Sequence, residues 1–186
     1  KRVTGLKSIQ DEYVKFLRFG QWKLVDSGNK DILTYIINNY FLDGMAFRGL
    51  RYSLRNAFDQ IYIINLHGDP KKNISHNKND KNLFSIQTGV CILICLARGE
   101  KTQSLAPVYY CEKLGSIEEK FEFLNRGFED LMENKFHLIP ETRDYEFIPK
   151  SKETIQLENE YYSYSYLPEI FVKHIVGAQS LHDTLV

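Results

Sequence analysis

The stretch from Asp31 to Gly99 decides the fold of this chain: DILTYIINNYFLDGMAFRGLRYSLRNAFDQIYIINLHGDPKKNISHNKNDKNLFSIQTGVCILICLARG. Three runs rich in β-branched and other apolar residues, at 32–38, 60–66 and 90–97, have the length and composition of β-strands. Residues 46–58 lie between the first two runs and carry apolar side chains at helical spacing. Strands that alternate with a helix predict an α/β fold.

The connections between these segments predict how the strands run. The helix at 46–58 joins the strands at 32–38 and 60–66 with the spacing of a βαβ unit, so these two strands are expected to point in the same direction. The polar segment 71–81 leaves no room for a crossover helix, so the strands at 60–66 and 90–97 are expected to be an antiparallel pair. The mostly apolar strand 32–38 is expected to be buried on both faces.

Further segments flank this stretch. Helical spacing of apolar residues predicts a helix over 11–25, in which Trp22 is expected to pack, and an amphipathic helix over 117–132. A short strand is expected at 107–111. The expected divisions are an α/β part at 1–111, a helical connector at 112–150 and a further region at 151–186 that contains a tyrosine cluster.

Length and composition bound the possibilities. A chain of 186 residues allows one sizeable domain, or a domain and part of another. The sequence has no apolar run long enough to span a membrane and no signal peptide at its start, so a cytoplasmic location is expected. Because the chain begins with lysine rather than methionine, we expect a piece of a longer protein. The three cysteines have no metal-binding spacing and are expected to be buried thiols.

The net charge is zero, but residues 1–111 hold sixteen Lys and Arg against nine Asp and Glu. On the predicted helix at 46–58, Arg48, Arg51 and Arg55 form a stripe beside the apolar one. Arginine is well suited to phosphate, so these residues are candidates for contacts with DNA phosphates, together with Lys71 and Lys72. A solvated basic face is the alternative.

Two polar residues end predicted strands. Asn38 closes the strand at 32–38, at the end that faces the ligand crevice in open α/β sheets. A turn-forming asparagine is the alternative. His67 follows the strand at 60–66, and a structural role is expected for it because no partner is near it in the sequence.

Several ordered segments resemble the large single-chain restriction-modification enzymes that carry an adenine-specific DNA methyltransferase. They are EYVKFLRFGQWKL, then GNKDILTYIINNYFLDGMAFRGLRYSLRNAFDQIYIINLHGDPKK, then NLFSIQTGVCI and VYYCEKLGSIEEKFEFL. The family order is a helix after an Asn-Pro-Pro-Tyr motif, a strand ending in Asn with an FRG-type helix, a strand ending in a His-Gly-like turn, and a Phe-x-Ile-Gln-x-Gly-Val strand. EIFVKHIVGAQSLHDTLV resembles the start of the family's target-recognition region.

The resemblance implies a class I, Rossmann-like methyltransferase fold that uses S-adenosylmethionine and acts on double-stranded DNA. Such enzymes flip adenine out of the duplex and methylate its exocyclic amine. By this resemblance, residues 1–111 are the C-terminal half of the catalytic domain. Phe84 would lie against the flipped adenine, Gly89 would let the backbone approach the base, and Asn38 would line the same pocket. A core-filling Phe84 is the alternative.

The departures from the family are equally informative. The sequence contains neither the glycine-rich turn nor the acidic residue that hold the cofactor, and it has no Asn-Pro-Pro-Tyr motif. This chain is therefore expected to be an inactive fragment, with an exposed strand edge that favours self-association. Two other interpretations stay open. One is a non-enzymatic nucleic-acid-binding module, and the other is a protein-docking scaffold that uses the acidic helix at 117–132.

Overall fold

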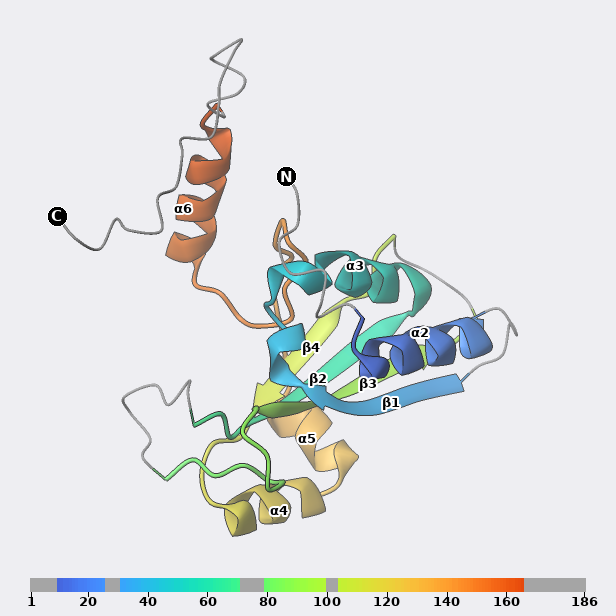
Figure 1. Cartoon of the computed structure of the whole chain (residues 1–186), viewed down its shortest axis with the longest axis vertical. Helices are drawn as coiled ribbons and strands as arrows, with labels where there is room; N and C mark the ends of the chain where they lie inside the picture. Colours follow the sequence, from blue (N-terminus) through green and yellow to red (C-terminus); the bar gives the residue numbers. More distant parts are fainter. Residues whose placement is uncertain (1–9, 26–30, 71–78, 100–103, 166–186) are drawn as a thin grey trace, which may run out of the picture. The chain divides into compact units, whose positions relative to one another are not determined.

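The computed structural model describes residues 10–25, 31–70, 79–99 and 104–165, which form two units. The first unit, residues 1–149, contains a five-stranded sheet with helices on both faces (Figure 1). The second unit, residues 150–186, contains helix α6 (Lys152–Ser163), and none of the residues of α6 is buried. Of the segment 112–150, which was expected to be a helical connector, residues 112–149 cluster with the first unit.

Three strands of the sheet run in one direction and two run in the opposite direction. Its strands are β1 (Asp31–Asn38), β2 (Gln60–His67), β3 (Val90–Ala97), β4 (Val108–Glu112) and β5 (His137–Leu138), in the spatial order β1-β3-β2-β4-β5. Strand β3 is antiparallel to both β1 and β2, β4 is parallel to β2, and β5 is antiparallel to β4. The antiparallel pairing across the polar segment is confirmed, and β1 and β2 do point in the same direction. They are not neighbours, because β3 lies between them.

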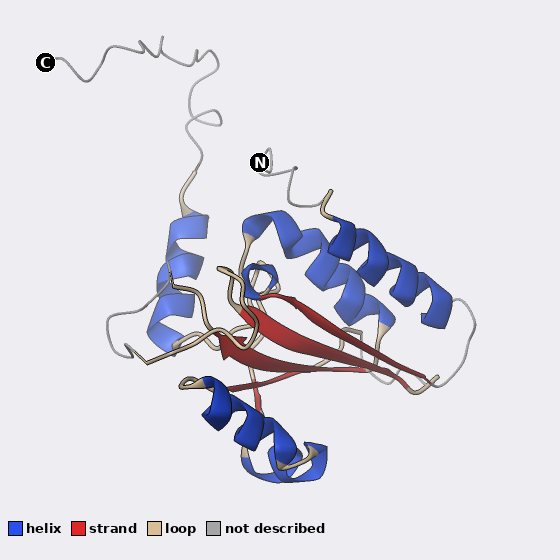
Figure 2. Cartoon of the chain, turned by 60° about the horizontal axis from the view of Figure 1, so that its bottom comes forward, coloured by secondary structure: helices blue, strands red, loops and turns tan. Residues whose placement is uncertain are grey.

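Helices α2 (Glu12–Val25) and α3 (Arg48–Ala57) cover one face of the sheet (Figures 1 and 2). Two 3₁₀ turns, Asn39–Phe41 and Met45–Phe47, lead from β1 into α3. The main core lies under these helices; buried members from the helices and strands include Leu17, Leu33, Phe47, Leu54, Phe58, Ile61 and Leu93. All three cysteines are free and buried, and burial raises the pKa of each thiol.

Helices α4 (Ile117–Asn125) and α5 (Phe128–Asn134) cover the other face (Figure 2). The single helix expected over 117–132 is interrupted at Gly127, which has a φ of 86° and caps α5 without continuing α4. Within these helices Lys120, Phe123 and Leu131 are buried, whereas Phe121 is exposed.

Strand β1 is an edge strand of this sheet, and one of its faces is bare. Ile32 and Ile36 are 66% and 54% exposed, while the alternate residues Leu33 and Ile37 are buried under the helices. The expectation that this strand is buried on both faces is therefore wrong for the described residues. Trp22 on α2 is 52% exposed, and its ring packs against that of Phe19, with the ring centroids 5.8 Å apart.

Candidate functional site

The carboxyl ends of the parallel strands meet at one edge of the sheet. The last residues of β1 and β2, Asn38 and His67, both lie opposite Val90, the first residue of β3. Glu112, the last residue of β4, pairs with Asn65 on β2. In open α/β sheets this edge is where ligands bind, so the predicted site residues are described here first.

Asn38, Asn39 and Gly89 form a closely packed corner at this edge. The side-chain oxygen of Asn38 accepts a hydrogen bond from the Tyr40 N–H at 2.8 Å, which is the turn role considered as its alternative. The Asn39 N–H donates to the Gly89 carbonyl at 2.9 Å. A Cβ on Gly89 would lie 2.4 Å from the side-chain amide nitrogen of Asn39. The close approach at Gly89 is therefore filled by a neighbouring side chain of this protein.

Phe84 lies on a bent loop and not on a strand. The strand expected from Phe84 onward begins only at Val90, because residues 83–88 form a series of bends. Within that loop Phe84 is 41% exposed and Ile86 is 48% exposed, so the core-filling alternative for Phe84 is excluded. The ring is available at the surface beside the strand ends.

Asn82 fixes this loop with three hydrogen bonds. Its amide nitrogen donates to the carbonyls of Gly68 at 2.9 Å and of Thr88 at 2.8 Å. Its amide oxygen accepts from the Phe84 N–H at 2.8 Å. The two ends of the loop are thus held together and joined to the turn that follows β2.

His67 belongs to a polar network that connects β2 and β4. Its Nε2 lies 2.9 Å from Oε2 of Glu112, which also accepts a hydrogen bond from the Tyr110 hydroxyl at 2.7 Å. Asn65 donates to the Tyr110 hydroxyl at 3.0 Å. The hydrogen bond with His67, followed by the bond from Tyr110, lowers the pKa of Glu112 from its ordinary value, although partial burial acts in the opposite direction. His67 therefore has a specific partner, 45 residues away in the sequence.

A buried ion pair fixes the segment that leads into the Phe84 loop. The Lys120 ammonium lies 2.6 Å from Oδ1 of Asp80, and the Lys120 side chain is fully buried. The other carboxylate oxygen of Asp80 accepts from the Gly68 N–H at 2.7 Å, and Oδ1 also accepts from the Gly115 N–H at 3.1 Å. The Asp80 side chain thereby links the turn after β2 to the start of α4.

The arginine stripe on α3 is largely structural. The Arg51 side chain has no exposed surface and donates to four backbone carbonyls, those of Phe41, Gly44, Asp144 and Tyr145, at 2.8 to 2.9 Å. Its desolvation lowers its pKa to about 10, so it remains charged at neutral pH.

Arg55 is buried as well, and it donates to the Ala106 carbonyl and to Glu141. The prediction that Arg51 and Arg55 contact DNA phosphates is therefore wrong, because their donors are directed into the protein. Arg48 has a half-exposed side chain and pairs with Asp144 at 3.1 Å. Lys71 and Lys72 lie outside the described residues.

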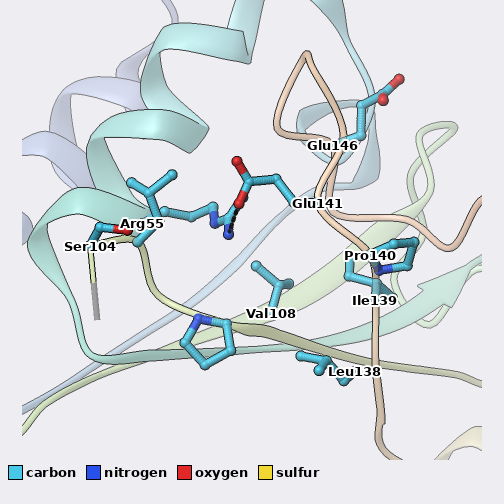
Figure 3. Close-up of a pocket in the computed structure, with 10 residues that line it drawn as sticks. Arg55, Ser104, Val108, Leu138, Ile139, Pro140, Glu141 and Glu146 are labelled. Atoms are coloured by element: carbon cyan, nitrogen blue, oxygen red, sulfur yellow. Dashed lines mark hydrogen bonds and ion pairs between the residues drawn. The ribbon is translucent and has the colours of Figure 1, made fainter. Parts of the chain in front are cut away.

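A groove among the described residues lies away from the carboxyl edge. It has a volume of about 580 Å³ and lies beside Val108, at the opposite end of β4 from Glu112 (Figure 3). The ion pair between Arg55 and Glu141, at 3.0 Å, forms part of its wall. A smaller groove of about 270 Å³ adjoins Glu112 and is lined by both acidic and basic side chains.

No family model matches this chain, and no curated protein matches its sequence. Solved structures do match its fold. They include the ATP-dependent Type ISP restriction-modification enzyme LlaBIII bound to DNA, with a TM-score of 0.69 and 24% identity over 80% of this chain. A nuclease-deletion mutant of the Type ISP restriction-modification enzyme LlaGI, in complex with a DNA substrate mimic, gives 0.66 and 22% identity over 84%. A DrdV–DNA complex gives 0.66 and 23% identity over 82%.

This chain spans 10%, 13% and 14% of the lengths of LlaBIII, LlaGI and DrdV, respectively. At this level of identity the likeness establishes a shared fold. In the part of the chain that the structure describes, no helix is long and apolar enough to cross a membrane.

Sequence reasoning missed the residues that organise the site. Asn82 has one usable signal, since an asparagine two residues before Phe84 has the spacing of an Asx turn. Asp80 and Lys120 had none, because a lysine within an acidic helix reads as solvent-exposed. Glu112 could not be paired with His67 without knowing that β4 lies beside β2.

Proposed function

We propose that this chain is part of an adenine-specific DNA methyltransferase that belongs to a bacterial restriction-modification enzyme. The parent enzyme would transfer a methyl group from S-adenosylmethionine to the exocyclic amine of an adenine flipped out of double-stranded DNA. The observation that carries the proposal is the exposed Phe84, held on an anchored loop at the ligand-binding edge of an α/β sheet. The shared fold with restriction-modification enzymes in complex with DNA supports it.

The exposure of Phe84 suits the role proposed for it. A base removed from the duplex loses its stacking partners, and a flat apolar side chain can replace them. Phe84 and Ile86 project from the same loop, and neither is needed to fill the core. Asn38, at the end of β1, is proposed to line the same pocket. Its side-chain oxygen already accepts a hydrogen bond from the Tyr40 N–H.

The described residues do not fit a cofactor cradle. A cofactor would need open backbone at a strand-to-helix turn, and glycine is the residue that provides it. Between β1 and α3, a Cβ on Gly44 would lie 2.6 Å from the Tyr40 carbonyl, so that position is filled by protein. Between β4 and α4, the space at Gly115 is filled by the Glu119 carboxylate. We therefore propose that S-adenosylmethionine is bound by parts of the parent enzyme outside these turns.

Among the described residues, β1 has no neighbouring strand on its outer side, and this edge supports the view that the sheet is part of a larger one. Eight residues of β1 form a regular strand with no proline or bulge, so the edge lacks the features that block further pairing. Ile32 and Ile36 are exposed on the face of β1 opposite Leu33 and Ile37. Helix α2 also exposes three aromatic side chains, those of Phe16, Phe19 and Trp22. Apolar surface around an unprotected edge is what remains when neighbouring strands and their covering segments are missing.

The two alternative functions have weaker support. A nucleic-acid-binding module would have used the arginine stripe, but Arg51 and Arg55 direct their donors into the protein. A docking scaffold would have used the acidic helix, but the inward face of α4 and α5, including Phe123 and Leu131, is already packed against the sheet.

The proposal is tested by expressing the complete reading frame that contains this chain in a host without adenine methylation of its own. Host DNA is then sequenced by a method that detects N6-methyladenine. We expect methylation of one DNA sequence motif, a strong decrease with Phe84→Ala, and retained methylation with Phe84→Trp. Phe121→Ala, which removes an exposed ring from α4, is the matched control. Absence of N6-methyladenine with the natural sequence would refute the proposed function, and full activity of Phe84→Ala would refute the role of Phe84.

A further inference from the structure

Asn82 is the residue through which the Phe84 loop is joined to the rest of the sheet edge. Its three hydrogen bonds reach the Gly68 carbonyl, the Thr88 carbonyl and the Phe84 N–H, all within 2.9 Å. They use both donors and one acceptor of a single side-chain amide. An aspartate has no donor for the two carbonyls, and a serine hydroxyl has one donor, so neither can reproduce this arrangement.

The turn after β2 is shaped to receive this side chain. His67 and Gly68 have consecutive positive φ values of 49° and 81°, which turn the Gly68 carbonyl toward Asn82. A Cβ on Gly68 would lie 2.5 Å from the Asn82 Cα, so the backbone of the turn and the backbone of the loop touch directly. Such contact is possible because glycine has no side chain at this point.

The start of the segment is fixed independently of Asn82. Asp80 is held by Lys120 and by the backbone N–H groups of Gly68 and Gly115. Removing the Asn82 amide should therefore leave residues 79–81 in place and release only the part that follows, which carries Phe84. This separation makes the effect of Asn82 on the loop measurable.

We infer that Asn82 is a positioning residue that holds the Phe84 ring where it stacks against the flipped base. The inference rests on the proposed function for its purpose, but the anchoring itself is a property of this chain. The amide would act before DNA arrives, so that the ring is ordered in advance and does not lose conformational freedom when the base enters. Asn82 itself would not touch the reacting atoms.

The first test measures the anchoring without DNA, by amide hydrogen exchange of the chain. Asn82→Asp and Asn82→Ala are compared with Asn79→Asp, a control that makes the same chemical change at an exposed position three residues earlier. We expect exchange across residues 83–88 to become at least tenfold faster in both Asn82 variants and to stay unchanged in the control. Exchange in β2 and β3 should not change, which also verifies that the variants fold. Unchanged exchange across 83–88 in folded Asn82 variants would overturn the inference.

The second test uses the complete enzyme and asks whether Asn82 acts through Phe84. The substrate is DNA that carries the sequence motif that the natural enzyme methylates. Asn82→Asp is expected to lower kcat/KM at least tenfold relative to the natural enzyme. The same change made in the Phe84→Ala variant should alter the kcat/KM of that variant less than twofold. A fully additive double variant would overturn the inference. If the natural enzyme methylates no adenine, the proposed function fails, and the exchange experiment still decides whether Asn82 anchors the loop.

Discussion

Replacing Arg51 by methionine is expected to destabilise the first unit strongly. Methionine keeps the long apolar stem, but it leaves the backbone carbonyls of Phe41, Gly44, Asp144 and Tyr145 without their donor. A hydrogen bond to a charged group contributes roughly 1.5–3 kcal/mol net, so four such bonds have an upper limit of roughly 6–12 kcal/mol. Total stabilities of domains are about 5–15 kcal/mol. Allowing for carbonyls that regain water, we expect a loss of at least about 4 kcal/mol.

The measurement is urea unfolding of the chain followed by circular dichroism, with the midpoint and slope fitted for each variant. Arg51→Lys keeps the charge with fewer donors and should lose roughly half as much as Arg51→Met. Arg48→Met removes an arginine one turn earlier on the same helix, where the side chain is 47% exposed and paired with Asp144. Only the Arg48 side of this pair is exposed, because the Asp144 side chain is 11% exposed, so this control should lose some stability but clearly less than Arg51→Met. A loss below about 1 kcal/mol for Arg51→Met would refute the reasoning.

Three further predictions follow from other parts of the molecule. Gly127→Ala should lower the free energy of unfolding by about 1 kcal/mol, because the φ of Gly127 is positive but the space around it is open. Gly68→Ala should lower it clearly more, because the added Cβ would meet the backbone of Asn82. Equal urea midpoints for the two variants would contradict this. The isolated chain should self-associate, and Ile36→Lys on the bare face of β1 should shift it toward monomer in size-exclusion chromatography; a natural chain that is monomeric at high concentration counts against this. Glu112→Gln should lower the free energy of unfolding at pH 7. The difference between the natural protein and this variant should shrink as the pH falls through the pKa of Glu112, which lies below its ordinary 4.5. At that pH the Glu112 carboxylate, which is bonded to His67, becomes protonated and loses its charge in the natural protein as well. A difference that stays constant between pH 7 and pH 3 would contradict this.

Local patterns predicted most of the fold. The runs that became β2 and β3 are apolar and β-branched. Of the apolar residues at helical spacing between β1 and β2, Phe47, Leu54 and Phe58 are buried and Leu50 is partly buried. These features depend on residues close together in the sequence, where periodicity is a direct consequence of geometry. The break at Gly127 was missed because a single glycine within a helical pattern is often tolerated.

The site was predicted less well because its contacts are distant in the sequence. Arg51 was predicted to contact DNA phosphates on the basis of its residue type. Its carbonyl partners at Asp144 and Tyr145 are more than 90 residues away in the sequence and could not be predicted. His67 was given no partner for the same reason, since Glu112 approaches it only when β4 pairs with β2. Phe84 is 41% exposed, and it lies on a loop that is hydrogen-bonded to Asn82 and not on the expected strand.

The error about β1 is itself informative. Both faces of this strand are apolar, which is the pattern of a strand that is covered on both faces. The described residues cover the face of Leu33 and Ile37 and leave Ile32 and Ile36 exposed. Because α4 and α5 pack against β2 and β4, through contacts such as Phe128 on Tyr62, they do not supply the missing cover. The sequence of β1 therefore fits a larger sheet than the one that the described residues form.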